Sequence, residues 1–208
     1  MATRPANCCK AVDYSPRPCF SAICWTHQFI NMLLIRPSRS PDLAAITAIY
    51  AQQVLHGTGT FETEPPTLAE MTARRDDVLA KQLPFLVAED AGEIIGFAYC
   101  NWFKARPAYR YSAEDSIYLS PEAQGRGLGR ALLTELAARA ETAGVRKLIA
   151  VIGDSANAGS IGLHRSVGFQ QVGVLTSCGW KFDRWLDVVL MEKVLGAGDQ
   201  CPPQAHGV

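Results

Sequence analysis

The sequence has no long apolar run, no excess of charge of either sign and no Cys-x-x-Cys pair. Its 20 Lys and Arg residues balance 20 Asp and Glu residues, whereas a nucleic-acid-binding protein usually carries a basic excess. No stretch reaches the roughly 18 uninterrupted apolar residues of a membrane-spanning helix. We therefore expect neither nucleic acid nor a membrane as a partner.

The seven cysteines indicate neither a zinc site nor a disulfide framework. Four of them lie before residue 32, the other three are scattered, and no histidine stands near a cysteine pair. Structural zinc sites bring such ligands together at short, regular spacings. An odd count with little cysteine in the folded region favours a reducing compartment. We expect a cytoplasmic protein that binds no metal.

Length and composition predict one folded domain with an extension at each end. A chain of 208 residues that is 48% hydrophobic and 19% charged is ordinary for a single globular domain. Residues 1–31 contain three prolines and show neither a helical nor a strand period. They are either a loosely ordered extension or lie before a natural start at Met32. We expect the domain to span residues 32–195 and a flexible tail to span residues 196–208.

Hydrophobic periodicity predicts an α+β fold with one mixed sheet rather than a doubly wound nucleotide-binding fold. The expected strands span residues 33–35, 85–88, 94–102, 112–120, 148–152, 169–175 and 185–191. The expected helices span residues 40–54, 67–81, 128–144 and 160–167. For the first helix we expect Ser40 to be the cap residue. For the second, Thr67 and Glu70 form a capping-box pattern.

The segment from Asp115 to Arg130 predicts a strand, a glycine-rich turn and the start of a helix. Backbone N–H groups at a helix start lack partners and carry partial positive charge. A diphosphate fits there, because glycines let the backbone approach it closely, and Arg126 and Arg130 would add charge. The pattern is neither a dinucleotide fingerprint, since Arg130 replaces the last glycine, nor a P-loop, which needs Lys-Ser/Thr.

What is present, Gln124-x-x-Gly127-x-Gly129, resembles the acyl-CoA diphosphate loop of the GNAT superfamily of N-acetyltransferases. The run from Asn157 to Phe169 resembles the closing motif of that superfamily. Four further segments resemble its phosphinothricin and methionine sulfoximine N-acetyltransferase subfamily: residues 61–67, 102–109, 114–118 and 179–187. The resemblance spans residues 33–193. It implies a GNAT-type, mostly antiparallel central sheet flanked by helices, acetyl-CoA as co-substrate and a homodimer.

The resemblance also implies which residues contact acetyl-CoA. Backbone N–H groups of Ile117, Tyr118 and Leu119 would face the thioester and pantetheine, with Leu119 as the oxyanion donor. Asn157 would hydrogen-bond the pantetheine or phosphate, although from the sequence alone it is a cap or turn residue. The diphosphate loop would comprise Gln124, Gly125, Arg126, Gly127, Leu128, Gly129 and Arg130.

Transfer of an acetyl group from a thioester to an amine needs a base, an oxyanion site and a way for the thiolate to leave. Glu114 is the candidate base, or a carboxylate that only holds the substrate ammonium by charge. His164 stands where many superfamily members have the proton-donating Tyr, so it is either the donor or a packing residue against the cofactor. No cysteine lies in a Cys–His arrangement, so a covalent intermediate is not indicated.

Basic residues before Glu114 suit a zwitterionic substrate that bears an extra acidic group, because Arg matches carboxylate and phosphinate oxygens. A solvated, charged loop is the alternative interpretation of Lys104, Arg106 and Arg110. The full set of residues expected to contact the substrate is Phe61, Glu62, Lys104, Arg106, Tyr109, Glu114, Asp115 and Ser116.

The expected function is direct transfer of acetyl from acetyl-CoA to the α-amino group of a small amino acid or analogue of the phosphinothricin or methionine sulfoximine type. One alternative is a protein N-terminal acetyltransferase, which needs an open groove for a peptide. The other is a non-catalytic acyl-CoA sensor, which loss of the pocket carboxylate would favour, yet Glu114 is present.

Overall fold

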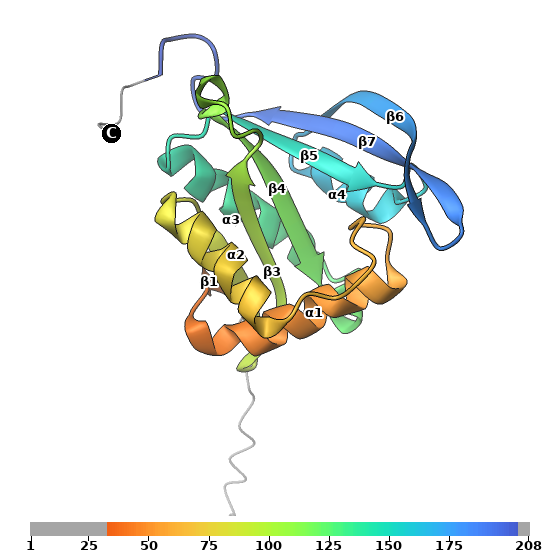
Figure 1. Ribbon diagram of the computed structural model, residues 1–208. Coiled ribbons are helices and arrows are strands. Elements are labelled where there is room, and N and C mark those ends of the chain that lie inside the picture. Colours follow the sequence, from red (N-terminus) through yellow and green to blue (C-terminus); the bar gives the residue numbers. More distant parts are fainter. Residues whose placement is uncertain (1–32, 204–208) are drawn as a thin grey trace, which may run out of the picture. The chain divides into compact units, whose positions relative to one another are not determined.

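A seven-stranded sheet is the frame of the computed structural model, which describes residues 33–203 (Figure 1). Its spatial order is β1-β2-β3-β4-β5-β7-β6, and every neighbouring pair is antiparallel except β4 and β5. This confirms the predicted mixed, mostly antiparallel sheet. The strands are β1 (Leu34–Pro37), β2 (Phe85–Asp90), β3 (Glu93–Trp102), β4 (Ser112–Leu119), β5 (Lys147–Gly153), β6 (Gln170–Lys181) and β7 (Arg184–Val194).

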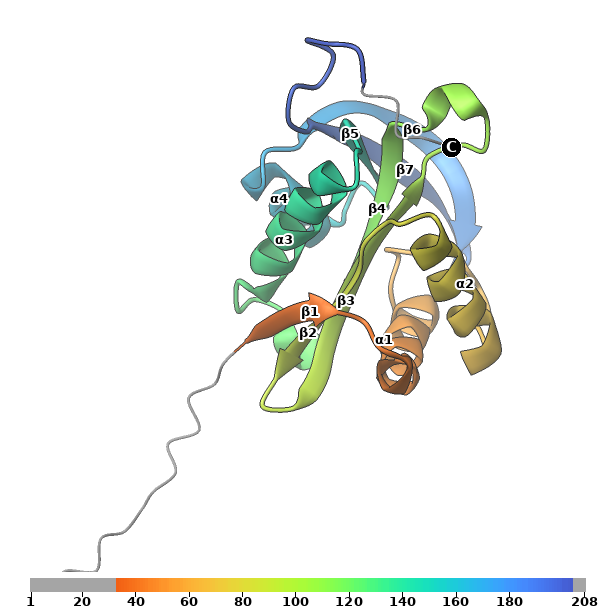
Figure 2. The ribbon, with the colours of Figure 1, turned by 90° about the vertical axis from the view of Figure 1, so that its left-hand side faces the viewer.

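Helices cover both faces of the sheet (Figure 2). One face carries α1 (Leu43–His56) and α2 (Leu68–Ala80), and the other carries α3 (Leu128–Thr142) and α4 (Ala158–Ser166). The chain order of helices and strands is the predicted one, and none of the described helices is long and apolar enough to cross a membrane.

The core lies between the sheet and its helices. In α3 the buried side chains recur every three or four residues, which is the apolar stripe that the sequence predicts. Burial of each large apolar side chain contributes about 1.5–3 kcal/mol. Phe85 and Phe97 on neighbouring strands are fully buried and stack with their ring centroids 5.9 Å apart. Strands β2 and β3 are thereby fixed relative to each other.

The starts of the two helices on the first face differ in how well the sequence predicts them. The capping box of α2 is present: Thr67 Oγ1 accepts from the N–H of Glu70 (3.2 Å), whose carboxylate accepts from the N–H of Thr67 (2.7 Å). For α1 the prediction of Ser40 as the cap is wrong. Ser40 lies inside a 3₁₀ turn, and the carboxylate of Asp42 instead accepts from the N–H of Arg39 (2.6 Å).

The last third of the domain also departs from the predicted boundaries. Helix α4 begins at Ala158, two residues earlier than expected. Strands β6 and β7 extend into one long hairpin, because cross-strand pairing runs from Gln170 to Lys181 with irregularities between Gln171 and Gly173 and between Leu175 and Gly179. Residues 196–199 form turns, in which Gly198 N–H donates to the Leu195 carbonyl (2.9 Å). The expectations for residues 1–31 and 204–208 lie outside the described residues.

Strands β4 and β5 diverge, and this positions the site. They pair in parallel only from Ser112 with Lys147 to Asp115 with Ala150. Beyond that point β4 continues to Leu119 and β5 to Gly153 without pairing to each other. An opening between adjacent strands leaves main-chain groups available for a ligand. The sheet is therefore open at its centre.

Candidate active site

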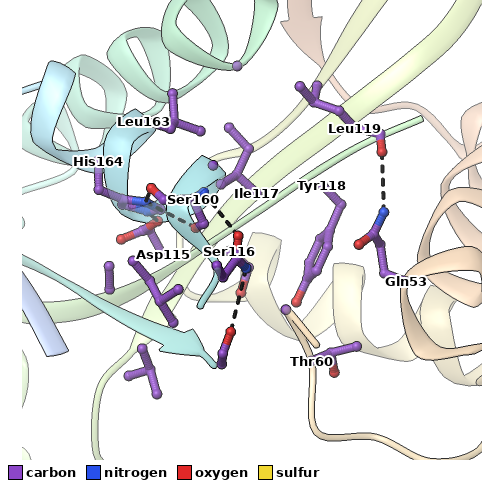
Figure 3. A pocket seen from close by; sticks show the side chains of 18 of the residues that line it. Gln53, Thr60, Asp115, Ser116, Ile117, Tyr118, Leu119, Ser160, Leu163 and His164 are labelled. Carbon is purple, nitrogen blue, oxygen red and sulfur yellow. Dashed lines mark hydrogen bonds and ion pairs between the residues drawn. The ribbon is translucent and has the colours of Figure 1, made fainter. Parts of the chain in front are cut away.

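A cavity of about 650 Å³ occupies the opening between β4 and β5. Its walls come from α1, the loop after α1, β4, residues 124–130, the end of β5 and α4 (Figure 3). The volume lies within the usual range of small-molecule sites. Because the strands diverge, residues from both faces of the sheet reach one space.

Side chains of β4 point alternately to the two faces, as the strand period requires. The ring of Tyr118 meets the ring of Tyr50 on α1 edge to face, with centroids 4.9 Å apart. Glu114, Ser116 and Tyr118 therefore share the α1 face. Asp115 points the other way, toward α4, where it contacts His164. We name the α1 side, which carries Glu114, the acceptor side, and the α4 side, which carries Asp115 and His164, the cofactor side, after the roles that the sequence predicts for Glu114 and His164.

Glu114 lies half-buried on the acceptor side, opposite Asn101 of β3. Burial raises the pKa of its carboxyl group, the neighbouring charge of Asp115 adds to this, and Lys104 opposes it. A carboxylate with a raised pKa is a stronger proton acceptor at neutral pH. The position and the pKa of Glu114 thus suit it for deprotonating an ammonium group.

Asp115 and His164 form a buried pair on the cofactor side (Figure 3). Nε2 of His164 lies 2.9 Å from Oδ2 of Asp115, and the two residues are only 2% and 6% exposed. Nδ1 of His164 lies 2.7 Å from the carbonyl oxygen of Ser160. That carbonyl only accepts hydrogen bonds, so Nδ1 must carry a proton.

One proton is therefore shared between Nε2 of His164 and Oδ2 of Asp115. Burial opposes a charge on the imidazole, but the hydrogen bond and charge of Asp115 and the carbonyl of Ser160 raise the pKa of His164 overall. A raised pKa of His164 favours the form in which the imidazole is protonated and Asp115 is a carboxylate. Oδ1 of Asp115 is buried and has no hydrogen-bond partner among the described residues.

The glycine-rich turn leads into α3 at the edge of the cavity. Gly125 and Gly127 have φ of 71° and 78°, the left-handed region that favours glycine. The first main-chain bond back to this turn is donated by Ala131 to the Gly127 carbonyl (3.4 Å), and within residues 33–203 no side chain caps the helix. The N–H groups without partners at the start of α3, and the space left by the missing glycine side chains, suit the binding of an anionic group there.

Several predicted site residues line the cavity. Asn157 also caps α4, since its Oδ1 accepts from the N–H of Ser160 at 3.1 Å. The capping interpretation of Asn157 is therefore confirmed. The predicted residues that line the cavity are Phe61, Glu114, Asp115, Ser116, Ile117, Tyr118, Leu119, Gln124, Gly125, Gly127, Gly129, Arg130, Asn157 and His164.

Other predicted residues do not line it. Arg126 pairs with Asp90 (2.8 Å) at the end of β2. Glu62 accepts hydrogen bonds from Arg74 (2.6 Å) and from the hydroxyl of Tyr50 (2.9 Å), so it holds the loop after α1. The remaining predicted residues outside the lining are Leu128, Lys104, Arg106 and Tyr109. The last three lie on the exposed segment between β3 and β4.

Sequence reasoning missed part of the acceptor side. Tyr50 and Gln53 face the cavity from α1, and Thr60 and Tyr99 join them. Nε2 of Gln53 donates to the carbonyl of Leu119 at 3.5 Å (Figure 3). The available signal was the polar Gln53 three residues after Tyr50, on the buried stripe of an amphipathic helix.

Cys100 lies on β3 opposite Asp115 and is fully buried. Burial and the nearby carboxylate raise the pKa of its thiol, so the reactive thiolate is disfavoured. The geometry therefore gives no support to a covalent thioester intermediate on this residue.

The cavity places a half-buried carboxylate, Glu114, on one side and a glycine-rich helix start on the other. This arrangement is typical of a transferase, which brings two substrates together in one site. Residues 46–169 match the acetyltransferase (GNAT) family. The chain belongs to this family and is an N-acetyltransferase.

The chain is similar in sequence and in fold to several named acetyltransferases. The chain is 51% identical over 170 residues to phosphinothricin N-acetyltransferase of Alcaligenes faecalis, covering 82% of this chain and 86% of that protein. It is 38% identical over 159 residues to L-methionine sulfoximine/L-methionine sulfone acetyltransferase of Pseudomonas aeruginosa, covering 76% and 92%. A phosphinothricin acetyltransferase from Sinorhizobium meliloti, solved in complex with AcCoA, aligns with a TM-score of 0.81 and 44% identity, covering 84% and 94%.

Proposed function

We propose that the protein acetylates the α-amino group of a small amino acid analogue that carries a phosphinate or sulfoximine group, with acetyl-CoA as donor. The single observation that carries the proposal is the half-buried Glu114 carboxylate at the opening between β4 and β5. The names of the two relatives support the substrate class.

The residues around the opening fit acetyl-CoA. The N–H groups at the start of α3 would hold the diphosphate, with Arg130 beside them. A Cβ atom at Gly129 would press on Leu163 and Leu119 at 3.2–3.3 Å, so this glycine allows α3, α4 and β4 to meet closely. The main chain of Ile117, Tyr118 and Leu119 would line the pantetheine and acetyl end, with the N–H of Leu119 donating to the oxyanion.

Each group has a defined task in direct transfer. Glu114 accepts a proton from the substrate ammonium, and the freed nitrogen lone pair forms the new C–N bond at the thioester carbonyl carbon. The oxyanion then re-forms the carbonyl as the C–S bond breaks, and the electron pair of that bond leaves on the CoA sulfur. The new amide nitrogen releases its remaining excess proton to solvent. We propose that His164, held as an imidazolium by Asp115, supplies the proton that this sulfur takes up, which requires one ring N–H to leave its partner, Asp115 or the Ser160 carbonyl. The products are the N-acetyl amino acid and free CoA.

A thiol-release assay tests the proposed substrate class. We expect acetyl-CoA-dependent release of CoA with phosphinothricin and with methionine sulfoximine, at higher kcat/KM than with unmodified amino acids. A peptide with a free amino-terminus serves as the comparison acceptor. Faster turnover of the peptide would favour the N-terminal acetyltransferase instead, and no release with any amine would favour a sensor.

We also propose a homodimer that uses the β6–β7 hairpin. Strand β6 is an edge of the sheet and exposes apolar side chains along its length. Trp180 and Trp185 pack edge to face at 5.3 Å yet remain 55% and 62% exposed. Exposed apolar surface on an unpaired edge strand is typical of an interface. A second copy of the chain is the partner that the family resemblance implies.

Light scattering after size exclusion tests this arrangement. We expect about twice the chain mass of 22.6 kDa for the wild type and a single chain mass for Trp180→Glu/Trp185→Glu. Leu55→Glu, at an apolar position on α1 that is 48% exposed, is the control and should stay dimeric. A wild type of single chain mass at micromolar concentration would contradict the proposal.

We propose that the protein is cytoplasmic, and the state of its cysteines supports this location. Within residues 33–203 the three cysteines, Cys100, Cys178 and Cys201, are all free thiols. Free thiols are the usual state of cysteine in a reducing compartment.

A further inference from the structure

Lys181 ties the β6–β7 hairpin to residues 57–62, which we name the acceptor loop. Its Nζ donates to the carbonyl oxygens of Gly57 (2.9 Å) and Thr60 (2.8 Å). The side chain is buried, with the whole residue only 4% exposed. Figure 1 shows the loop that follows α1 beside this hairpin, although more than 120 residues separate the two in sequence.

A buried ammonium group requires such partners. Removing a charged group from water is costly unless hydrogen bonds replace its hydration, and here burial lowers the pKa of Lys181. Two main-chain carbonyls supply the replacement, and the ring of Phe182 lies 5.0 Å from Nζ. The loop main chain is thereby held at two points by one side chain.

The acceptor loop forms a wall of the cavity. Thr60 and Phe61 both line it, and Oγ1 of Thr60 lies 2.9 Å from the hydroxyl of Tyr50. The ring of Phe61 packs on the main chain of Gly153 and Gly179, where a Cβ atom would overlap it. The position of the wall therefore depends on the hairpin, and Lys181 is the polar link between them.

We propose that Lys181 is a positioning residue for the amine acceptor, a conclusion that rests on the proposed function. Its ammonium fixes the acceptor loop so that Thr60 and Phe61 define the pocket beside Glu114. The buried Nζ reaches the loop main chain rather than the substrate. Loss of its two bonds loosens the acceptor wall and leaves the start of α3 unchanged.

Steady-state kinetics and hydrogen exchange of Lys181→Met test the proposal. We expect the KM for the acceptor that the wild type acetylates fastest to rise about tenfold, with kcat and the KM for acetyl-CoA within about threefold. Amide exchange in residues 57–62 should quicken, and this readout needs no acceptor. A wild type inactive on phosphinothricin and methionine sulfoximine would refute the proposed substrate while leaving the exchange test in force.

Two further variants keep the result interpretable. Lys193→Met is the matched control, because Nζ of Lys193 also donates to a main-chain carbonyl, that of Val167 at 2.7 Å. The acceptor KM of Lys193→Met should match that of the wild type. Gly179→Ala keeps Lys181 but displaces Phe61, and it should reproduce the raised acceptor KM. Unchanged exchange in the loop of Lys181→Met, or faster exchange with an unchanged acceptor KM, would overturn the proposal.

Discussion

Replacement of Glu114 by glutamine is expected to lower kcat/KM for the acceptor amine by about 10²–10⁴-fold at neutral pH, the usual contribution of a positioned base. Glutamine keeps the shape of the side chain and cannot take a proton. Glu114 lies on the acceptor side of β4, away from the start of α3. Stabilisation of the variant by acetyl-CoA, measured as a rise in Tm, should therefore equal that of the wild type.

The dependence of kcat/KM on pH should also change in Glu114→Gln. The pKa of Glu114 is raised, chiefly by burial, and a base acts only when deprotonated. The acidic limb of kcat/KM should therefore lie at a higher pH than an ordinary glutamate would give, with activity rising as the pH passes through that pKa. Glu114→Gln should lose this limb.

The split between kcat and KM separates the two roles left open for Glu114. A base supplies its effect in the transition state, so its loss lowers kcat. An anchor for the substrate ammonium holds the ground state, so its loss raises KM. Glu135→Gln, which removes a half-buried carboxylate paired with Arg139, is the control and should behave as the wild type. Unchanged turnover in Glu114→Gln would remove both roles.

The architecture was largely predictable because periodicity is a local signal. The stripe of α3, the capping box at Thr67 and the apolar strands each depend on residues close in sequence. The β6–β7 hairpin was underestimated for the same reason. Its outer end, from Gly179 to Lys181, carries no run of buried apolar side chains, and pairing with β7 keeps it in the sheet.

The site divides in a similar way. The glycine-rich turn was predictable because left-handed glycines and a helix start are adjacent in sequence. The opposite orientation of Glu114 and Asp115 was available from the strand period, yet both were expected to contact the substrate. The partners of Asp115 and Lys181 were not predictable, because His164 is 49 residues and Thr60 is 121 residues away. Tertiary packing alone brings these groups together.

Asp115→Asn is expected to lower kcat by about 10–100-fold, part of the 10²–10⁴-fold that a positioned general acid contributes. The substitution removes the charge that holds His164 as an imidazolium and keeps a group of similar size beside Nε2. Burial then acts on the imidazole without a balancing carboxylate, so the pKa of His164 should fall. The KM for acetyl-CoA should stay within about twofold.

Asp115→Asn should also change how the unfolding free energy and kcat depend on pH. In the wild type the pKa of His164 is raised above its ordinary value of 6.5. The stability that this shift contributes is complete below pH 6.5 and is lost as the pH rises through the folded-state pKa. The difference in unfolding free energy between wild type and Asp115→Asn should therefore narrow above pH 6.5. The alkaline limb of kcat should move to lower pH in the variant, because the imidazolium loses its proton earlier.

A stability effect alone would not establish a proton donor, so the comparison needs a buried aspartate outside the site. Asp42 is such a residue, because it is buried, pairs with Arg36 at 2.7 Å at the start of α1 and does not line the cavity. Asp42→Asn should lower Tm while kcat per folded molecule and the pH profile stay as in the wild type. If Asp115→Asn behaves in the same way, His164 only packs against the cofactor. A moved alkaline limb with a lowered kcat, together with a lower His164 pKa measured from its imidazole ¹⁵N shifts, assigns the proton to this pair.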